Sequence, residues 1–338
     1  MSLARPATAS PRGGTFAPSA TAGRLQRQKT GLANKIFVVA VDGSEQSVKG
    51  LHLTAAMWTP GDVARVITVC VTSNDAPDPT AVVSLSDAQK LSPEGLLMAS
   101  KHELVLRGIP SRNVTTDLID PEDKTIAEAL AAETNLLRRN AGLLILGATG
   151  KGSIRRAAGG AGLMGKVAEH VLLHCKCPIA LVKTESPAIY DDGPIKSLRP
   201  SLTIVACADR SHISMSAFDA ALRFCRGNDT LHVLHIETGR PDQEAPIKKY
   251  WEDVASKVSM SGSDVNVRVA CVAKGNTSVV ENILDFTHGC QAHLVVLGSI
   301  ELVRAPSNKE RTVLGSVAQA VARRATMPTC IVKNFSAI

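Results

Sequence analysis

Hydrophobic residues follow two alternating patterns along the chain. Short apolar runs rich in β-branched residues are typical of buried strands, and they alternate with segments in which apolar residues recur at helical spacing. The first set of expected strands lies at residues 36–41, 66–72, 114–119, 143–146 and 179–182. The second set lies at residues 203–207, 231–236, 265–271, 294–297 and 329–332. Strands that alternate with helices predict parallel sheets with helices packed on their faces.

The expected helices lie between these strands. In the first set they fall near residues 44–58, 93–107, 125–139 and 165–174, and Ser44 is placed to cap the first of them. In the second set one helix carries Met215, Phe218, Leu222 and Cys225 on one face, and the next carries Ile247, Trp251, Val254 and Val258. The order strand, helix, strand is therefore the same in both sets.

Individual residues also recur at a fixed offset. Gly165 and Gly315, Pro178 and Pro328, and the segments 181–183 and 331–333 are separated by 150 positions, which indicates an internal duplication. We predict two tandem open parallel-sheet domains of the Rossmann-like α/β class. The expected boundaries are a disordered basic tail at 1–34, a first domain at 35–184, a linker at 185–199 and a second domain at 200–338. These domains are called the first half and the second half below.

Charge and composition narrow the functional classes. The net charge is +7, but residues 1–41 hold six basic and no acidic residues, which leaves 7 − 6 = +1 for the remainder. With 3% aromatic residues, the chain lacks the basic and stacking surfaces of a nucleic-acid-binding domain. No apolar run approaches the roughly 20 residues of a membrane-spanning helix. Eight cysteines without an apolar leader favour reduced thiols and a cytoplasmic protein. The alternative is a mitochondrial or other organelle location, because the basic, Ser-rich tail resembles a transit peptide.

A glycine-rich segment follows the fourth strand of the first half. Glycines let the backbone approach an anion closely, and a helix start adds N–H donors and a positive dipole, so such a loop is suited to phosphate. Its alternative is a flexible surface loop without a ligand. The candidate phosphate-binding residues are Gly147, Gly150, Gly152, Gly165 and Lys166.

Three other motif matches are weaker. Gly160 to Lys166 spells the glycine spacing of a P-loop, but Val167 replaces the Ser or Thr that would hold Mg²⁺. The glycines at 147, 150 and 152 are in the wrong order for a dinucleotide fingerprint. The group His170, His174, Cys175 and Cys177 has no second Cys pair at zinc-like spacing, so we expect no metal site.

An aspartate ends the first strand of each half. Asp42 and Asp209 each precede a serine at the start of a helix. A carboxylate at a strand tip can accept hydrogen bonds from the base or sugar of a ligand, whereas helix capping is the alternative role of such residues.

Together these segments resemble the universal stress protein family in tandem form. Val41 to Ser47 match its V-D-x-S-x-x-S pattern, and Cys177 to Val182 match its closing C-P strand. The resemblance implies an adenine nucleotide alpha hydrolase-like fold and ATP, with or without Mg²⁺, held by the aspartate and the glycine loop. The chain departs from the pattern because Lys166 replaces a phosphate-binding Ser or Thr.

The second half departs further from the family pattern. Gly298, Gly315 and Ser316 remain, with Asp209, as weaker candidate ligands, but Glu301 replaces the second glycine. A carboxylate beside polyphosphate repels it, so the second half is expected to be degenerate.

These observations predict a non-enzymatic ATP-binding protein of stress response or signalling, with its site mainly in the first half. One alternative is a ligand-free interaction module in which the last strands of the two halves, 179–182 and 329–332, pair as an intramolecular pseudo-dimer. Another is a slow nucleotide hydrolase or transferase, although no general base is identifiable. The expected partner is a small-molecule nucleotide, with no nucleic acid and no membrane. The two domains are expected to pair with each other as a pseudo-dimer, and a homo-oligomer is left open.

Overall fold

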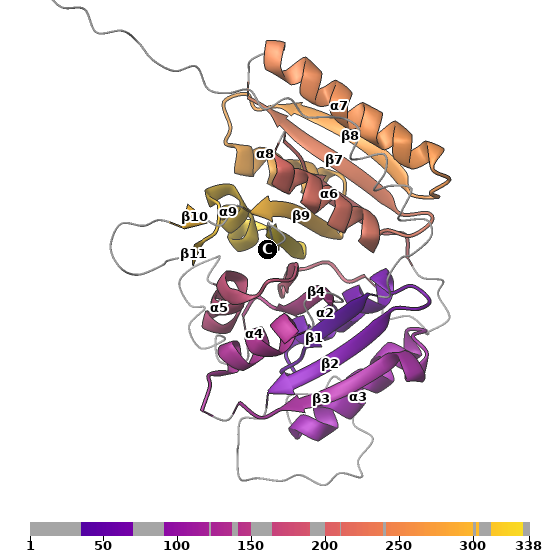
Figure 1. Ribbon diagram of the computed structural model, residues 1–338, viewed down its shortest axis with the longest axis vertical. Coiled ribbons are helices and arrows are strands. Elements are labelled where there is room, and N and C mark those ends of the chain that lie inside the picture. The colour runs from indigo at the N-terminus through magenta and orange to yellow at the C-terminus, as the bar shows by residue number, and fades with distance from the viewer. Residues whose placement is uncertain are drawn as a thin grey trace, which may run out of the picture. The chain divides into compact units, whose positions relative to one another are not determined.

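The computed structural model describes ten stretches of the chain. They are residues 35–69, 91–121, 123–136, 141–149, 164–189, 200–209, 211–238, 241–299, 302–303 and 312–333. The tail expected at 1–34 and residues 190–199 of the expected linker lie outside the described residues. Strands and helices alternate through both halves (Figure 1), as the hydrophobic patterns predict.

Ten strands of the described residues form one mixed sheet. In the first half they are β1 (Ile36–Ala40), β2 (Val63–Val69), β3 (Val114–Ile119), β4 (Ala141–Gly147) and β5 (Ile179–Val182). In the second half they are β6 (Thr203–Cys207), β7 (Thr230–Glu237), β8 (Asn266–Ala273), β9 (Leu294–Ser299) and β12 (Thr329–Lys333). A two-stranded hairpin, β10 (Leu302–Val303) with β11 (Thr312–Val313), stands apart from this sheet.

The strand order shows how the halves repeat. It runs β3-β2-β1-β4-β5-β12-β9-β6-β7-β8, so each half has the same order when read outward from the centre. Neighbouring strands within each half are parallel, and β5 pairs antiparallel with β12, with Ile179 opposite Ile331 and Leu181 opposite Thr329. The tandem α/β class is confirmed.

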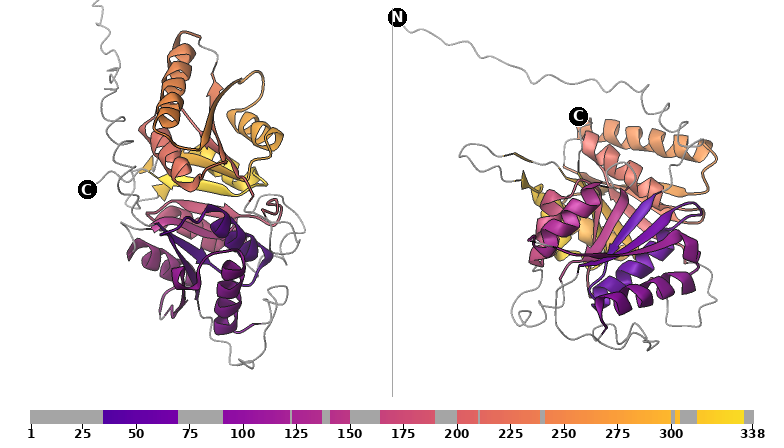
Figure 2. Two further views of the ribbon diagram at one scale, coloured as in Figure 1. Left: turned by 90° about the vertical axis from the view of Figure 1, so that its right-hand side faces the viewer. Right: turned by 60° about the horizontal axis from the view of Figure 1, so that its bottom comes forward.

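Helices cover both faces of the sheet (Figure 2). Those of the first half are α2 (Glu45–Met57), α3 (Pro93–Leu106), α4 (Ile126–Leu136) and α5 (Lys166–His174). Those of the second half are α6 (His212–Phe224), α7 (Pro241–Met260), α8 (Val279–Gly289) and α9 (Ser316–Arg324). Helix α2 packs with α3, α4 with α5, and α8 with α9.

The core lies along the central strands. Phe37, Val38 and Val39 of β1 and Leu143 to Ile145 of β4 have no exposed surface, because helices cover the sheet above and below. Burying an apolar side chain of this size stabilises a fold by roughly 1.5–3 kcal/mol relative to leaving it in water. These strands therefore read as continuous hydrophobic runs rather than as alternating ones.

A buried aspartate fixes the start of the sheet in each half. Asp62 accepts a hydrogen bond from Lys35 N at 3.0 Å, just before β1, and Asp229 accepts one from Leu202 N at 2.8 Å, just before β6. Asp62 also forms a 3.3 Å ion pair with Lys35 Nζ. These bonds explain why β2 begins at Val63, three residues before the start expected from its apolar run.

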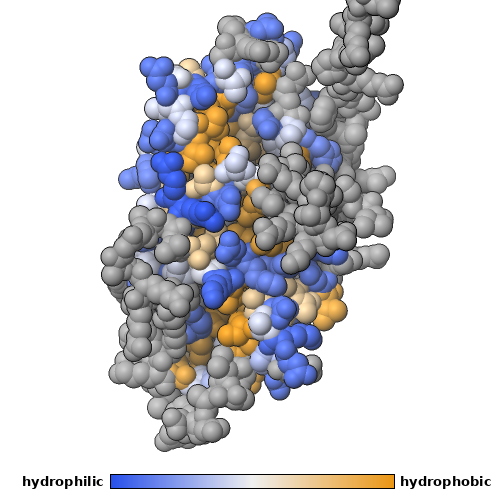
Figure 3. All heavy atoms as spheres, turned by 90° about the vertical axis from the view of Figure 1, so that its left-hand side faces the viewer, coloured by the Kyte–Doolittle hydropathy of each residue, from blue (hydrophilic) through white to orange (hydrophobic). Residues whose placement is uncertain are grey.

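The surface mixes polar and apolar side chains. On the face drawn in Figure 3, apolar side chains of described residues emerge in several patches between hydrophilic ones. The large apolar side chains with the most exposure are Met98, Val105, Leu118, Leu136 and Met260. Among the described helices, none combines the length and the apolar character that crossing a membrane requires.

Candidate functional site

The tip of β1 holds the first candidate residue. Asp42 is half-buried and its Oδ1 accepts a hydrogen bond from Ser44 N at 3.0 Å, across Gly43, whose φ of 77° lies in the left-handed region that favours glycine. Ser44 in turn caps α2 by accepting from Ser47 N. The capping role therefore falls to Ser44, and Asp42 shapes the turn that precedes the helix.

Gln46 ties this helix start to the loop that follows β4. Its Oε1 accepts from Thr149 N at 2.9 Å, and its Nε2 donates to Thr149 Oγ1 at 2.5 Å and to Thr184 Oγ1 at 2.9 Å. A Cβ at Gly147 would lie 2.8 Å from Gln46 Oε1, so glycine permits this approach. We call the three polar residues Gln46, Thr149 and Thr184 the Gln46 bridge.

The far end of the glycine-rich loop returns to the same place. Ala148 N donates to Val182 O at 2.7 Å, and Ala148 O accepts from Gly165 N at 2.7 Å. Gly165 is the N-cap of α5 and brings no side chain to its first N–H groups, and Lys166 is exposed on the first turn. Backbone N–H groups, a helix dipole and a lysine thus meet at the carboxyl edge of the sheet, which is a suitable arrangement for an anion.

The structure therefore brings together most of the candidate residues of the first half. Gly147, Gly165 and Lys166 meet through Ala148, and the turn of Asp42 is joined to them through the Gln46 bridge. Gly150 and Gly152 lie outside the described residues.

The second half repeats the turn but not the bridge. Asp209 accepts from Ser211 N at 2.7 Å, as Asp42 does from Ser44. Ile213 takes the place of Gln46, and a Cβ at Gly298 would lie 2.4 Å from Ile213 Cγ2. Apolar packing therefore replaces the polar contacts between this helix start and the loop after β9.

The loop after β9 is held in another way. Ser299 Oγ accepts from Gly315 N at 3.1 Å, where the first half uses a backbone carbonyl. Ser316 is exposed on the first turn of α9, as Lys166 is on α5. Glu301 lies outside the described residues, so the expected repulsion of phosphate stays a prediction.

Comparison with known proteins identifies the family. The model of the universal stress protein family matches residues 33–183 and 201–333. The chain belongs to the universal stress protein family. No curated protein matches the sequence.

Solved structures share the fold of this universal stress protein. A functionally unknown protein, PA1789 from Pseudomonas aeruginosa PAO1, is similar over 89% of this chain and 93% of its own, with a TM-score of 0.50 and 14% identity. A universal stress protein in complex with cAMP matches over 44% of this chain and 97% of its own, with a TM-score of 0.31 and 18% identity. A universal stress protein from Archaeoglobus fulgidus in complex with dAMP matches over 40% and 97%, with a TM-score of 0.27 and 19% identity.

In this universal stress protein, the contacts at the carboxyl ends of β1 and β6 also differ. In the first half Thr68 Oγ1 donates to Val41 O at 2.8 Å. At the equivalent position His235 Nδ1 donates to Ala208 O at 3.0 Å, and its Nε2 lies 2.5 Å from Glu244 Oε2. This hydrogen bond from His235 is the main reason why the pKa of Glu244 lies below its usual value.

Helix α7 covers the carboxyl end of β6, the first strand of the second half. Trp251 Nε1 donates to Asp209 O at 3.2 Å, and Glu244 near the start of the helix accepts from Thr238 N at 2.7 Å. Trp251 and Glu244 are both buried, so the chain itself supplies side chains around this tip.

The cysteines and histidines near α5 lie within and just after this helix. Among the described residues, no group of three or more His, Cys, Asp or Glu side chains is arranged to hold a metal ion. His170 and His174 stack with ring centroids 4.2 Å apart. Burial raises the pKa of Cys175, and it raises the pKa of Cys177 to about 12, so both side chains pack as neutral thiols.

Sequence reasoning missed the residues that join the site. Gln46 lies 103 positions from Thr149 and 138 positions from Thr184. Gln46 and Thr149 stand at unspecified positions of the aspartate and glycine motifs, and Thr184 lies in neither motif. One signal was present, because Gln46 is a polar residue at the position where the second half has Ile213. A polar residue on the buried side of a helix start requires partners, and here they are two loop threonines.

Proposed function

We propose that this universal stress protein binds an adenine nucleotide, ATP in the first instance, without turning it over, and serves in stress response or signalling. The site is the carboxyl edge of the first half. The single observation that carries the proposal is the meeting of Gly147, Ala148 and Gly165 at the start of α5, with Lys166 exposed beside them. Ligands of open α/β sheets bind at this edge.

Each part of the edge has a role in this proposal. The phosphates lie against the N–H groups at the start of α5 and the ammonium of Lys166, because both carry positive charge. Asp42 accepts hydrogen bonds from the sugar or base at the tip of β1.

Calorimetry on the full chain tests the proposal. Asp42→Ala is expected to weaken ATP binding about ten- to a hundredfold, because a hydrogen bond to a charged group contributes about 1.5–3 kcal/mol. Asp209→Ala is the matched control, since it removes the equivalent carboxylate from the degenerate half and is expected to leave the affinity unchanged. The cAMP and dAMP named for related structures serve as further titrants. Absence of ATP binding, or an equal loss in both variants, would overturn the assignment.

A second function is favoured by one observation. The last strands of the two halves, β5 and β12, pair antiparallel and leave neither as a bare edge. We therefore also propose that the halves form an intramolecular pseudo-dimer, which can act as an interaction module. Sedimentation of the full chain tests this: a monomer at micromolar concentration is expected, and a concentration-dependent dimer would show that copies of the chain associate through another surface.

A further inference from the structure

One lysine of the second half reaches the helix that begins at the candidate site. Lys333 ends β12 and is 2% exposed, and its Nζ donates to Leu173 O at 2.9 Å and to Cys175 O at 3.0 Å. These carbonyls belong to the last turn and the C-cap of α5. The last carbonyls of a helix have no partners within it, and the negative end of the helix dipole favours a cation. Lys333 therefore closes the carboxyl end of α5 from outside the first half.

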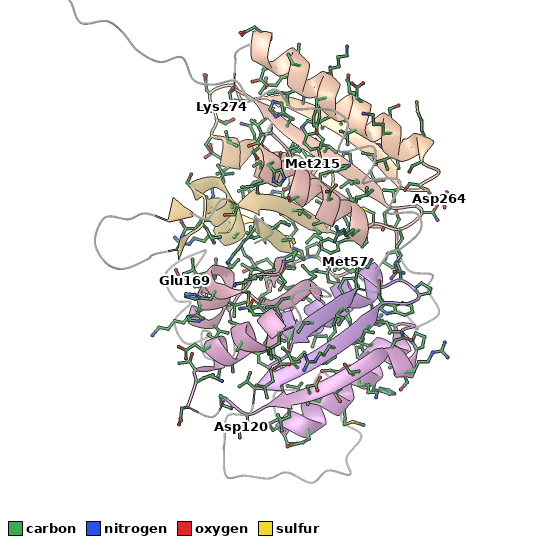
Figure 4. The ribbon with its side chains drawn as sticks, in the orientation of Figure 1. Met57, Asp120, Glu169, Met215, Asp264 and Lys274 are labelled. Atoms are coloured by element: carbon green, nitrogen blue, oxygen red, sulfur yellow. The ribbon has the colours of Figure 1, made fainter. Side chains whose placement is uncertain are left out.

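The first half makes the equivalent contact with a helix of the second half. Lys183 Nζ donates to Arg323 O at 2.8 Å and to Ala325 O at 2.6 Å, at the end of α9. Each donor and each acceptor corresponds to its counterpart by the offset of 150 residues. A weaker contact accompanies them, because Arg323 Nη2 lies 3.9 Å from Glu169 Oε1 on α5, and Glu169 is labelled in Figure 4. The lysines thus form a reciprocal pair in which each half caps a helix of the other.

The two ends of α5 are mechanically connected. The helix has nine residues and is about 13 Å long at 1.5 Å per residue, so it moves as one short rod. Its amino end is fixed by the hydrogen bond between Gly165 N and Ala148 O. Within the first half, its carboxyl end contacts α4 where Thr134 Oγ1 lies 3.1 Å from Cys175 Sγ. A change at the carboxyl end therefore tilts the rod about this fixed point and turns its first N–H groups.

Burying the ammonium group of Lys333 carries a free-energy cost. A buried ammonium is destabilising unless hydrogen bonds replace its water, and Lys333 obtains them from the carbonyls of α5. The α5 carbonyls in turn depend on the lysine, because buried acceptors without donors are also destabilising.

We propose that Lys333 is a positioning residue for the site of the first half, acting through α5. The second half, degenerate in its own site, thereby completes the site of its neighbour. This inference rests on the proposed nucleotide binding, because the amino end of α5 is the part of the site that the phosphates are proposed to contact. Lys333 touches no ligand itself.

The test compares Lys333→Met with Lys183→Met in the full chain. Each variant removes one cation from the same interface, Lys333 being buried and Lys183 half-buried, but the first releases α5 and the second releases α9. Lys333→Gln keeps a shorter neutral donor and serves as a milder variant should Lys333→Met fail to fold. Burial lowers the pKa of Lys183 to about 8, so the measurements are made at pH 7, where this lysine is charged.

Two readouts are taken on each variant. Hydrogen exchange of peptides covering residues 164–175 and 314–325 reports on α5 and α9 separately. ATP affinity by calorimetry reports on the site. Lys333→Met is expected to speed exchange in the α5 peptide and to weaken ATP binding about five- to fiftyfold, which lies within the usual range of coupling between sites. Lys183→Met is expected to speed exchange in the α9 peptide and to change the affinity less than about twofold.

The outcomes separate the two proposals. If the wild type binds no ATP, nucleotide binding fails, and the exchange of the α5 peptide in Lys333→Met still decides whether the lysine positions the helix. If the wild type binds ATP and Lys333→Met binds it equally, the positioning role is overturned. If both lysine variants lose affinity equally, the cause is loss of charge or a looser interface rather than the position of α5, and the inference is again overturned.

Discussion

Replacing Gln46 by isoleucine tests how the candidate site is held together. The second half has an isoleucine, Ile213, at the equivalent position, so the substitution gives the first half the residue found in the second. Gln46 is 6% exposed, and its amide makes three hydrogen bonds, two to Thr149 and one to Thr184. The variant removes all three and leaves the N–H of Thr149 without its acceptor.

The expected loss follows from these contacts. A neutral hydrogen bond contributes about 0.5–1.5 kcal/mol net, so three bonds correspond to about 1.5–4.5 kcal/mol. Thr184 is exposed and Thr149 is half-buried, so water replaces part of what is lost. Isoleucine also gains from apolar burial. We therefore expect the free energy of unfolding of the full chain to fall by about 1.5–3 kcal/mol.

Urea unfolding at pH 7, followed by circular dichroism, measures the change. The slope with denaturant should stay constant, since the surface exposed on unfolding is nearly the same. Glu45→Gln is the matched control, because it alters an exposed neighbour whose ion pair with Lys49 is worth at most about 1 kcal/mol. Hydrogen exchange of the peptide containing Thr149 should become faster in the Gln46 variant alone. A loss below about 0.5 kcal/mol with unchanged exchange would refute the structural role of the bridge.

The structure also predicts how two further substitutions change the stability of the chain. Gly298→Ala should destabilise the chain by about 1–3 kcal/mol in urea unfolding, because the added Cβ would meet the side chain and backbone of Ile213. Gly315→Ala has space for its Cβ and should lose only about 0.5 kcal/mol, because alanine is a poorer N-cap of α9 than glycine. Equal losses in the two glycine variants would contradict this reading. The hydrogen bond from His52 lowers the pKa of Glu103 to about 2, so its contribution to stability is present above about pH 4.5 and is lost as the pH falls toward 2. Glu103→Gln should flatten the decline in urea stability between pH 5 and pH 2, and an unchanged decline would argue against the ion pair.

The fold was predictable where local pattern and tertiary packing agree. Strand β3 was expected at 114–119 and β5 at 179–182, and both have these bounds because turn residues frame short segments rich in β-branched residues. Helix α7 was expected from the face formed by Ile247, Trp251, Val254 and Val258, and it also extends back through Pro246 to Pro241. Tertiary contacts explain the difference, because Glu244 is held by His235 and by Thr238 N in the first turns.

The candidate site was predictable only in part. Asp42, Gly147 and Gly165 carry local signals, because a strand tip, a close approach and a helix start each favour particular residue types. The partners Thr149 and Thr184 carry no such signal, since only the folded sheet brings β4 and β5 beside the start of α2. The placement of Gly150 and Gly152 stays a prediction.

The two halves differ most where a ligand would bind and least where they meet. Lys183 and Lys333 retain the same bonds at the same offset, while Ile213 stands where the first half has Gln46. Reciprocal contacts explain this contrast physically, because a change at either lysine uncaps a helix in the opposite half. The strand tip of the second half is under no such constraint, and α7 covers it with Trp251. The second half therefore differs from the first in the contacts at its strand tip and matches it in the lysine bonds that join the two halves.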